Sequence, residues 1–296
     1  MARKLDTTLA VLNGVIGDYL ARTRNGLAIR ATFVHEGRPL ALEREVLAST
    51  FPNAGAKLVV LVHGLMSTED FWRQADGSDY GTQLARDFGF TPLYLRYNTG
   101  LAIADNGASL SRLLAELVAA WPVEIDELIL LGHSMGGLVI RNACHVGQLD
   151  DAAWMTHVRR CIYVGTPHRG APLERAGRLV AKILDAVDDP YTRLIAELAN
   201  LRSTGIQDLG DRRHPVPLLP TIDHLLIAGT LIREPWLAPL FGDLLVSVGS
   251  ATDRARGEPN HPTTEIAVFP GLDHVALARR GEVYERMRQW CEAPTR

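Results

Sequence analysis

Short runs of apolar residues alternate with helical patterns from residue 57 onward. The run from Lys57 to Val62 is almost wholly apolar and rich in β-branched residues, which is typical of a strand buried on both faces of a sheet. Similar runs follow at 91–97, 127–131, 160–164, 224–229 and 265–269, and helical patterns lie at 80–88, 105–120 and 135–146. This alternation predicts an α/β fold, with a mostly parallel sheet, right-handed crossovers and helices on both faces.

The first 50 residues carry a different pattern. An amphipathic helix is predicted by apolar residues that recur every three or four positions: Leu5, Leu9, Leu12, Ile16 and Leu20. Two extended segments, 27–35 and 40–46, then flank Gly37 and Pro39, which predicts a hairpin of edge strands. We therefore assign residues 1–50 as a helix and hairpin that extend the core, and residues 51–170 as the first part of the core.

Residues 171–222 interrupt the alternation with two helical patterns and no strand. The first pattern runs from Leu173 to Val187 and the second from Tyr191 to Leu201, each with its apolar residues on one face. We interpret 171–222 as a helical cap inserted into the core, and residues 223–296 as the second part of that core.

Composition removes several classes of function. The chain is 47% hydrophobic and 22% charged, which excludes a disordered chain, and 31 basic against 34 acidic residues provide no basic stripe for nucleic acid. Three scattered cysteines indicate free thiols rather than disulfides or a zinc site. No apolar run approaches the roughly 18 residues of a transmembrane anchor, and polar residues interrupt the N-terminal segment where a secretory signal would be apolar. We therefore expect a cytoplasmic location.

The most informative segment is Gly132-His133-Ser134-Met135-Gly136, which joins a predicted buried strand directly to a predicted helix. Reversing from strand to helix within a few residues forces the serine into strained backbone geometry and leaves room only for glycine beside it. The start of the helix favours negative charge on a group that reacts there. Ser134 is thus the candidate nucleophile, and the alternative is a glycine-rich turn with a helix-capping serine.

A serine nucleophile needs a base and a third group that orients the base. His274 is the candidate base, because it follows the predicted strand 265–269 at the carboxyl end, where parallel sheets build their sites. Asp243 is the candidate acid, since it lies between the two in sequence and follows the strand 224–229. It could instead be an ordinary turn residue, with Asp223 and Asp253 as the reserve acids.

Backbone N–H groups must stabilise the negative oxygen of a tetrahedral intermediate. The predicted donors of this oxyanion hole are the N–H of Met135, directly after the nucleophile, and that of Leu65, after His63-Gly64 at the end of the first buried strand. A simple strand-to-helix turn is the alternative for His63-Gly64. We interpret His63, His133 and His168 as structural.

Together these segments, with Gly165-Thr166-Pro167-His168-Arg169-Gly170 and Gly242-Asp243-Leu244, resemble the α/β-hydrolase superfamily and, within it, the lipase and esterase branch. The resemblance is strongest over 57–170 and returns over 223–290. It implies a serine hydrolase of carboxylic esters with Ser134, Asp243 and His274 as its triad, and a cap that forms an acyl pocket or lid. Leu244 departs from the pattern, because a small residue often follows the aspartate in this branch.

The substrate is less defined by the sequence. We expect a small-molecule or lipid ester of a medium or long acyl chain, bound by Leu179, Ile183, Leu194 and Trp236, although these side chains could equally be core packing. The reaction needs neither cofactor nor metal, and its rate should fall in acid as the histidine takes up a proton. Open alternatives are a thioesterase, amidase or acyltransferase with the same triad, and an inactive fold that only binds. The sequence leaves the oligomeric state open.

Overall fold

An eight-stranded sheet forms the centre of the protein in a computed structural model that describes residues 2–170, 203–210, 216–230, 246–253 and 263–294. The strands lie in the order β2-β1-β4-β3-β5-β6-β7-β8. β1 is antiparallel to its neighbours, and every pairing from β4 to β8 is parallel. The predicted mostly parallel sheet is therefore confirmed. The strand bounds are β1 (Thr32–His35), β2 (Arg38–Pro39), β3 (Lys57–Val62), β4 (Thr91–Arg96), β5 (Glu127–His133), β6 (Val158–Val164), β7 (Asp223–Thr230) and β8 (Thr264–Pro270).

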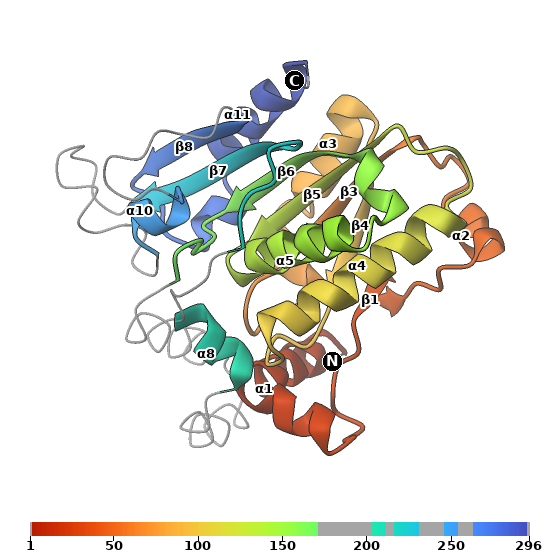
Figure 1. Cartoon of the computed structure of the whole chain (residues 1–296), viewed down its shortest axis with the longest axis vertical. Helices are drawn as coiled ribbons and strands as arrows, with labels where there is room; N and C mark the ends of the chain where they lie inside the picture. Colours follow the sequence, from red (N-terminus) through yellow and green to blue (C-terminus); the bar gives the residue numbers. More distant parts are fainter. Residues whose placement is uncertain (1, 171–202, 211–215, 231–245, 254–262, 295–296) are drawn as a thin grey trace.

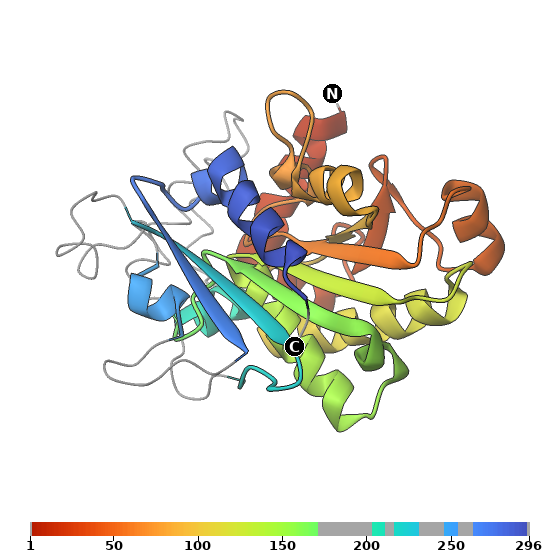
Figure 2. The same cartoon turned by 90° about the horizontal axis from the view of Figure 1, so that it is seen from above.

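Helices cover both faces of the sheet (Figure 1, and from above in Figure 2). α4 (Ile103–Ala120) and α5 (Met135–Leu149) lie on one face, and α3 (Tyr80–Phe88) and α11 (Gly281–Glu292) on the other. Shorter elements are α2 (Arg44–Thr50), η1 (Glu69–Trp72), η2 (Ala153–His157), α10 (Val248–Ala251) and η3 (Ala276–Ala278). These helices confirm the predicted α/β class.

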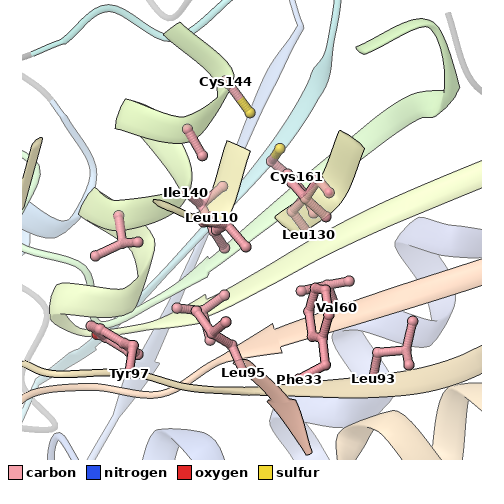
Figure 3. Packing of buried hydrophobic residues seen from close by; sticks show 14 of the residues in the cluster. Phe33, Val60, Leu93, Leu95, Tyr97, Leu110, Leu130, Ile140, Cys144 and Cys161 are labelled. Atoms are coloured by element: carbon pink, nitrogen blue, oxygen red, sulfur yellow. The ribbon is translucent and has the colours of Figure 1, made fainter. Parts of the chain in front are cut away.

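The sheet divides the hydrophobic core into two layers. Alternate residues of β3 point to opposite faces: Val60 packs in the layer beneath α4 and α5, and Leu61 packs in the layer beneath α3 and α11. Figure 3 shows part of the first layer, where Cys144 of α5 and Cys161 of β6 face one another. The three cysteines are free thiols, as predicted, and these two are buried.

The first helix, α1 (Ala2–Arg22), is confirmed, and most of the predicted apolar stripe faces inward, since Leu20 is buried and Leu12 and Ile16 pack on the core. Leu5 is 71% exposed, whereas Gly14 and Gly17 are buried. A β-carbon built on Gly14 would lie 2.2 Å from Met66 Cγ, and one on Gly17 would lie 1.9 Å from Asn98 Oδ1. The glycines let the helix backbone touch the segments that follow β3 and β4, so α1 lies at the carboxyl edge of the sheet.

The predicted hairpin is only partly correct. Residues 40–46 do not form a strand, because β2 ends at Pro39 and α2 begins at Arg44. Proline has no N–H with which to continue the ladder of hydrogen bonds beyond β2. The residues that follow include good helix formers, and the helix that they form buries Leu47. The segment 27–31, also predicted as extended strand, precedes β1 and is held by Asn13, whose side chain bonds to Leu27 O and Ile29 N.

The predicted cap falls mostly outside the described residues, and both of its helical patterns, 173–187 and 191–201, lie there. Within the described part of that interval, α8 (Thr204–Gly210) packs on α1. Ser203 Oγ donates a hydrogen bond to Gly14 O at 2.6 Å, and Thr204 Oγ1 donates one to Asp18 Oδ2 at 2.9 Å. Among the described helices, none combines the length and apolar character that crossing a bilayer requires.

Candidate active site

Ser134 occupies the sharp turn between β5 and α5. Its backbone lies at φ 53° and ψ −125°, a conformation that costs energy for a residue with a β-carbon. Its N–H donates to Val164 O at 2.9 Å, which ties the turn to the end of β6. The strained serine predicted from the sequence is therefore present at the carboxyl edge of the sheet, and only 3% of its surface is exposed.

Glycines surround this turn because backbone and side-chain atoms occupy the space that a β-carbon would need. A β-carbon on Gly136 would lie 2.2 Å from Val62 O, and one on Gly137 would lie 2.0 Å from Thr166 Oγ1. One on Gly132 would lie 2.6 Å from Gly137 N. The elbow is thus pressed against the ends of both neighbouring strands, β3 and β6.

The fold brings His274 to the elbow from 140 residues further along the chain. His274 is buried on the loop after β8, and its ring centroid lies 4.7 Å from that of His133, the residue before Ser134. His133 Nε2 donates to the His274 carbonyl at 2.9 Å. Burial, with His274 close by, lowers the pKa of His133 well below its ordinary value, so His133 is neutral. Its structural role therefore includes holding the backbone of the candidate base.

The loop that carries His274 is fixed by its neighbour Asp273. One carboxylate oxygen of Asp273 accepts hydrogen bonds from the N–H groups of Val275 at 3.0 Å and Ala276 at 2.8 Å. The carboxylate therefore caps the turn that leads into η3 and is engaged by the backbone of its own loop.

The candidate acid Asp243 lies outside the described residues, as do the candidate acyl-pocket residues Leu179, Ile183, Leu194 and Trp236. Of the two reserve acids, Asp223 begins β7 and lies at the amino edge of the sheet, roughly 25 Å along the strand from the edge that carries Ser134. Asp253 pairs with Arg141 at 3.1 Å and with Arg169 at 3.7 Å. The topology therefore removes Asp223, and Asp253 belongs to a different cluster.

The predicted oxyanion loop lies directly against the nucleophile. A β-carbon on Gly64 would be 3.1 Å from Ser134 Cβ, so the backbone that leads to Leu65 passes beside the elbow. Met66, the next residue, has φ 56°, and its N–H donates to Thr99 Oγ1 at 3.1 Å. On the other side, Met135 is the first residue of α5, where backbone N–H groups have no partner within the helix.

His63 and Tyr97 hold the start of this loop. The fully buried His63 ring stacks on Tyr97 at 4.6 Å, and its Nδ1 donates to Gly64 O at 2.9 Å. Tyr97 returns a hydrogen bond from its hydroxyl to His63 O at 2.8 Å. The structural role expected of His63 agrees with these contacts. The support from Tyr97 and Thr99 was not predicted, because these residues follow β4, more than 30 positions along the chain, and reach the loop only through the pairing of β4 with β3.

Acid should weaken the fold through His63. Burial lowers the pKa of His63 from 6.5 to about 4, so between these values the unfolded chain binds a proton that the folded chain does not. The free energy of unfolding should therefore fall by about 3 kcal/mol for this residue as the pH drops from 7 to 4.

Urea unfolding across this range should show a smaller pH dependence in His63→Asn. His157→Asn, which changes a half-exposed histidine on η2, should keep the dependence of the parent protein. Equal pH dependence in both variants and the parent would contradict this prediction.

A buried ionic cluster behind the elbow was also not predicted. Arg141 of α5 is 4% exposed; its Nη1 lies 2.7 Å from His168 Nδ1 and donates to Asp253, and its Nη2 donates to Val216 O. Burial and the nearby guanidinium lower the pKa of His168 well below its ordinary value, so His168 is neutral and accepts. Arg141 thus joins the helix of the nucleophile to the loop after β6. A charged residue on the otherwise apolar face of α5 was the available signal.

The arrangement can support nucleophilic chemistry: a strained serine at a helix start, an imidazole that packs against the residue before the serine, and a loop of backbone N–H groups. Across the described ranges, no group of three His, Cys, Asp or Glu side chains could hold a metal ion.

Solved structures similar to this one have the α/β-hydrolase fold. A lipase of Bacillus licheniformis, BlEst2 in its mature form, is 20% identical, with 79% of this chain and 91% of that chain covered and a TM-score of 0.50. The Pyrococcus furiosus esterase PF2001 is 14% identical, with 81% and 82% covered and a TM-score of 0.52. YbtT, a type II thioesterase of the yersiniabactin pathway, is 19% identical, with 81% and 91% covered and a TM-score of 0.50.

These likenesses establish the fold, and a match in sequence establishes the family. A search of the curated proteins finds no match. Residues 56–210, just over half of the chain, match the family described as PGAP1-like alpha/beta domain. That range contains β3, the candidate oxyanion loop and the complete elbow around Ser134. The protein therefore has the α/β-hydrolase fold and belongs to the family of PGAP1-like alpha/beta domains.

Proposed function

We propose that the protein is a serine hydrolase that cleaves carboxylic esters through an acyl-enzyme on Ser134. The observation that carries this proposal is the strained backbone of Ser134 at the start of α5, next to a histidine that holds the loop of His274. A serine needs no left-handed backbone to cap a helix, so the strain points to a reactive rather than a structural role.

In the proposed reaction, His274 takes the Ser134 proton while Oγ attacks the ester carbonyl. The resulting oxyanion accepts hydrogen bonds from the N–H groups of Leu65 and Met135. The C–O bond to the alcohol then breaks, and the alcohol leaves with the proton from His274. Water next attacks the acyl group with His274 again as base, which releases the carboxylic acid and restores the Ser134 hydroxyl.

The third member of the proposed triad is Asp243, which would accept from the second ring nitrogen of His274 and fix its tautomer. Its place after β7 in the chain supports this role, since the loop after β7 begins at the edge that carries His274. We further propose a medium or long acyl chain for the substrate, held by Leu179, Ile183, Leu194 and Trp236. The similarity to a type II thioesterase makes a thioester the alternative substrate, which an acyl-chain series of esters and thioesters would separate.

Covalent labelling tests the nucleophile directly. A fluorophosphonate probe should label the protein, and peptide mapping should place the adduct on Ser134. Ser67→Ala is the matched control, because its hydroxyl lies beside the same site and donates to Leu65 O at 3.2 Å, and this variant should still be labelled. An unlabelled protein, or an adduct that maps to another residue, would contradict the proposal and favour a fold that only binds.

Thr99 should influence this reaction without touching the substrate. Thr99→Val removes the acceptor of the Met66 N–H and frees a loop that also carries a left-handed Met66. We expect kcat for ester hydrolysis to fall about tenfold, part of the 10²–10³-fold that loss of a complete oxyanion donor costs, with KM little changed. Thr99→Ser keeps the hydroxyl and should restore kcat. A rise in KM alone, or no recovery with serine, would show that Thr99 has only a packing role.

A further inference from the structure

A hollow of about 960 Å³ lies beside α1, away from the elbow. Its wall consists of the end of α1 and the following loop (Ala21–Ala31), the residues after β4 (Asn98 and Leu101), and one face of α4. Figure 1 shows α1 next to the start of α4, where these segments meet. The volume falls in the range of sites for small molecules rather than single ions.

The charge of this hollow is opposite to that of the protein. Three arginines line it, Arg24, Arg30 and Arg112, against one carboxylate, Glu116, whereas the whole chain carries a net charge of −3. All three arginines are exposed to solvent, Arg112 also donates to Ser109 Oγ at 3.2 Å, and in the described ranges no carboxylate forms an ion pair with any of them. The hollow therefore has guanidinium groups with capacity for an external anion.

Two of the arginines project from a loop whose backbone is fixed. Asn13, which is fully buried, donates to Leu27 O and accepts from Ile29 N, both at 2.9 Å. Arg24 stands in the left-handed region at φ 52°. The third arginine is on α4, itself packed against α5. Because the three side chains start from ordered backbone, less conformational entropy is lost when they gather around a ligand.

The remaining walls add polar and apolar character. Asn98 and Asn106, which are 1% and 3% exposed, provide a buried polar floor. Ile29, Leu101 and Leu113 provide an apolar side. A ligand that matches these walls has an anionic group for the guanidinium forks and an apolar portion beside it.

From these observations we infer that the hollow is a binding site for a phosphate-bearing amphiphile, with the phosphate held by Arg24, Arg30 and Arg112. Phosphate oxygens match the planar fork of donors on a guanidinium, and a dianionic phosphate balances the net charge of the lining. The same chemistry is presented by a free phosphate ester and by the phosphomonoester headgroup of a lipid. This site is separate from Ser134 and does not depend on hydrolysis.

The test compares two charge-matched variants of the full chain. Arg30→Gln/Arg112→Gln removes two arginines from the hollow, and Arg38→Gln/Arg159→Gln removes two exposed arginines elsewhere. Binding of inorganic phosphate is measured by calorimetry, and sedimentation is measured with phosphatidylcholine vesicles that contain or lack phosphatidic acid. We expect the first variant to bind the phosphate-bearing probe at least about tenfold more weakly than the parent protein, and the second to match the parent within about twofold.

The two probes distinguish the sources of the phosphate. Binding of inorganic phosphate that also displaces the protein from vesicles supports a soluble phosphate ester, and binding only to vesicles with phosphatidic acid supports a lipid headgroup. Equal weakening in both variants, or no response of the parent protein to either probe, would overturn the inference. Ser134→Ala should bind as the parent protein does, so failure of the proposed hydrolase function and failure of this site give different results.

Discussion

Replacement of Ser134 by alanine is expected to lower kcat for ester hydrolysis by about 10⁴–10⁶-fold, because the acyl-enzyme can no longer form. His274→Ala should cause a loss of similar size, since an unactivated serine is a poor nucleophile. The two residues act as one unit, so the double variant should be no slower than either single variant. The measurement is steady-state hydrolysis of a chromogenic ester series.

Unfolding curves provide the control for these variants. Removing a hydroxyl from the strained position 134 should leave the free energy of unfolding unchanged or slightly higher. A Ser134→Ala protein that kept more than about a tenth of kcat would show that another group attacks the ester. Losses that multiplied in the double variant would show that Ser134 and His274 act independently.

Gly136→Ala should cause the largest loss of stability. Its new β-carbon would lie 2.2 Å from Val62 O and 2.5 Å from His63 O, both backbone atoms of the strand end that leads into the oxyanion loop. This steric overlap can be relieved only if α5 and the end of β3 move apart. We therefore expect a loss of about 3 kcal/mol in the free energy of unfolding, measured in urea. Hydrolysis should fall in parallel, since the same movement displaces Ser134 from the loop of Leu65.

Gly281→Ala is the matched control, because a β-carbon at this first residue of α11 meets no atom within 4 Å. Alanine is the better helix former, so this variant should be unchanged or more stable by up to about 1 kcal/mol. If both glycine variants unfolded at the same urea concentration as the parent protein, the close contact between α5 and the end of β3 would be refuted.

The sequence predicted those parts of the fold that depend on local pattern. The continuous apolar run of β3 and the strand, turn and helix around Ser134 needed only nearby residues, and the structure confirms them. The prediction was incomplete where residues far along the chain determine which positions of a helix make close contacts. Leu12, Ile16 and Leu20 of the predicted stripe do pack inward, but the periodicity could not indicate the close contacts that Gly14 and Gly17 make with Met66 and Asn98.

The same distinction applies to the candidate site. The strained turn at Ser134 was predictable, because the glycines and the adjoining strand and helix that determine it are all neighbours in sequence. Thr99 and Arg141 act through contacts across 33 and 112 positions, and no local signal specifies such partners. Sequence reasoning left Asp223 available as an acid. Only the strand direction, which places it at the amino edge of the sheet, removed it.

The close seat of α1 affects the order in which the protein can fold. This helix precedes all of its partners in the chain, and its contacts reach Met66, Asn98 and, 189 positions away, Ser203. During synthesis, the surface of α1 that these contacts bury therefore stays exposed until β3, β4 and finally α8 have been synthesised. Assembly of the edge that carries Ser134 is thereby a late event, which would restrict the proposed hydrolysis to chains that have completed their long-range contacts.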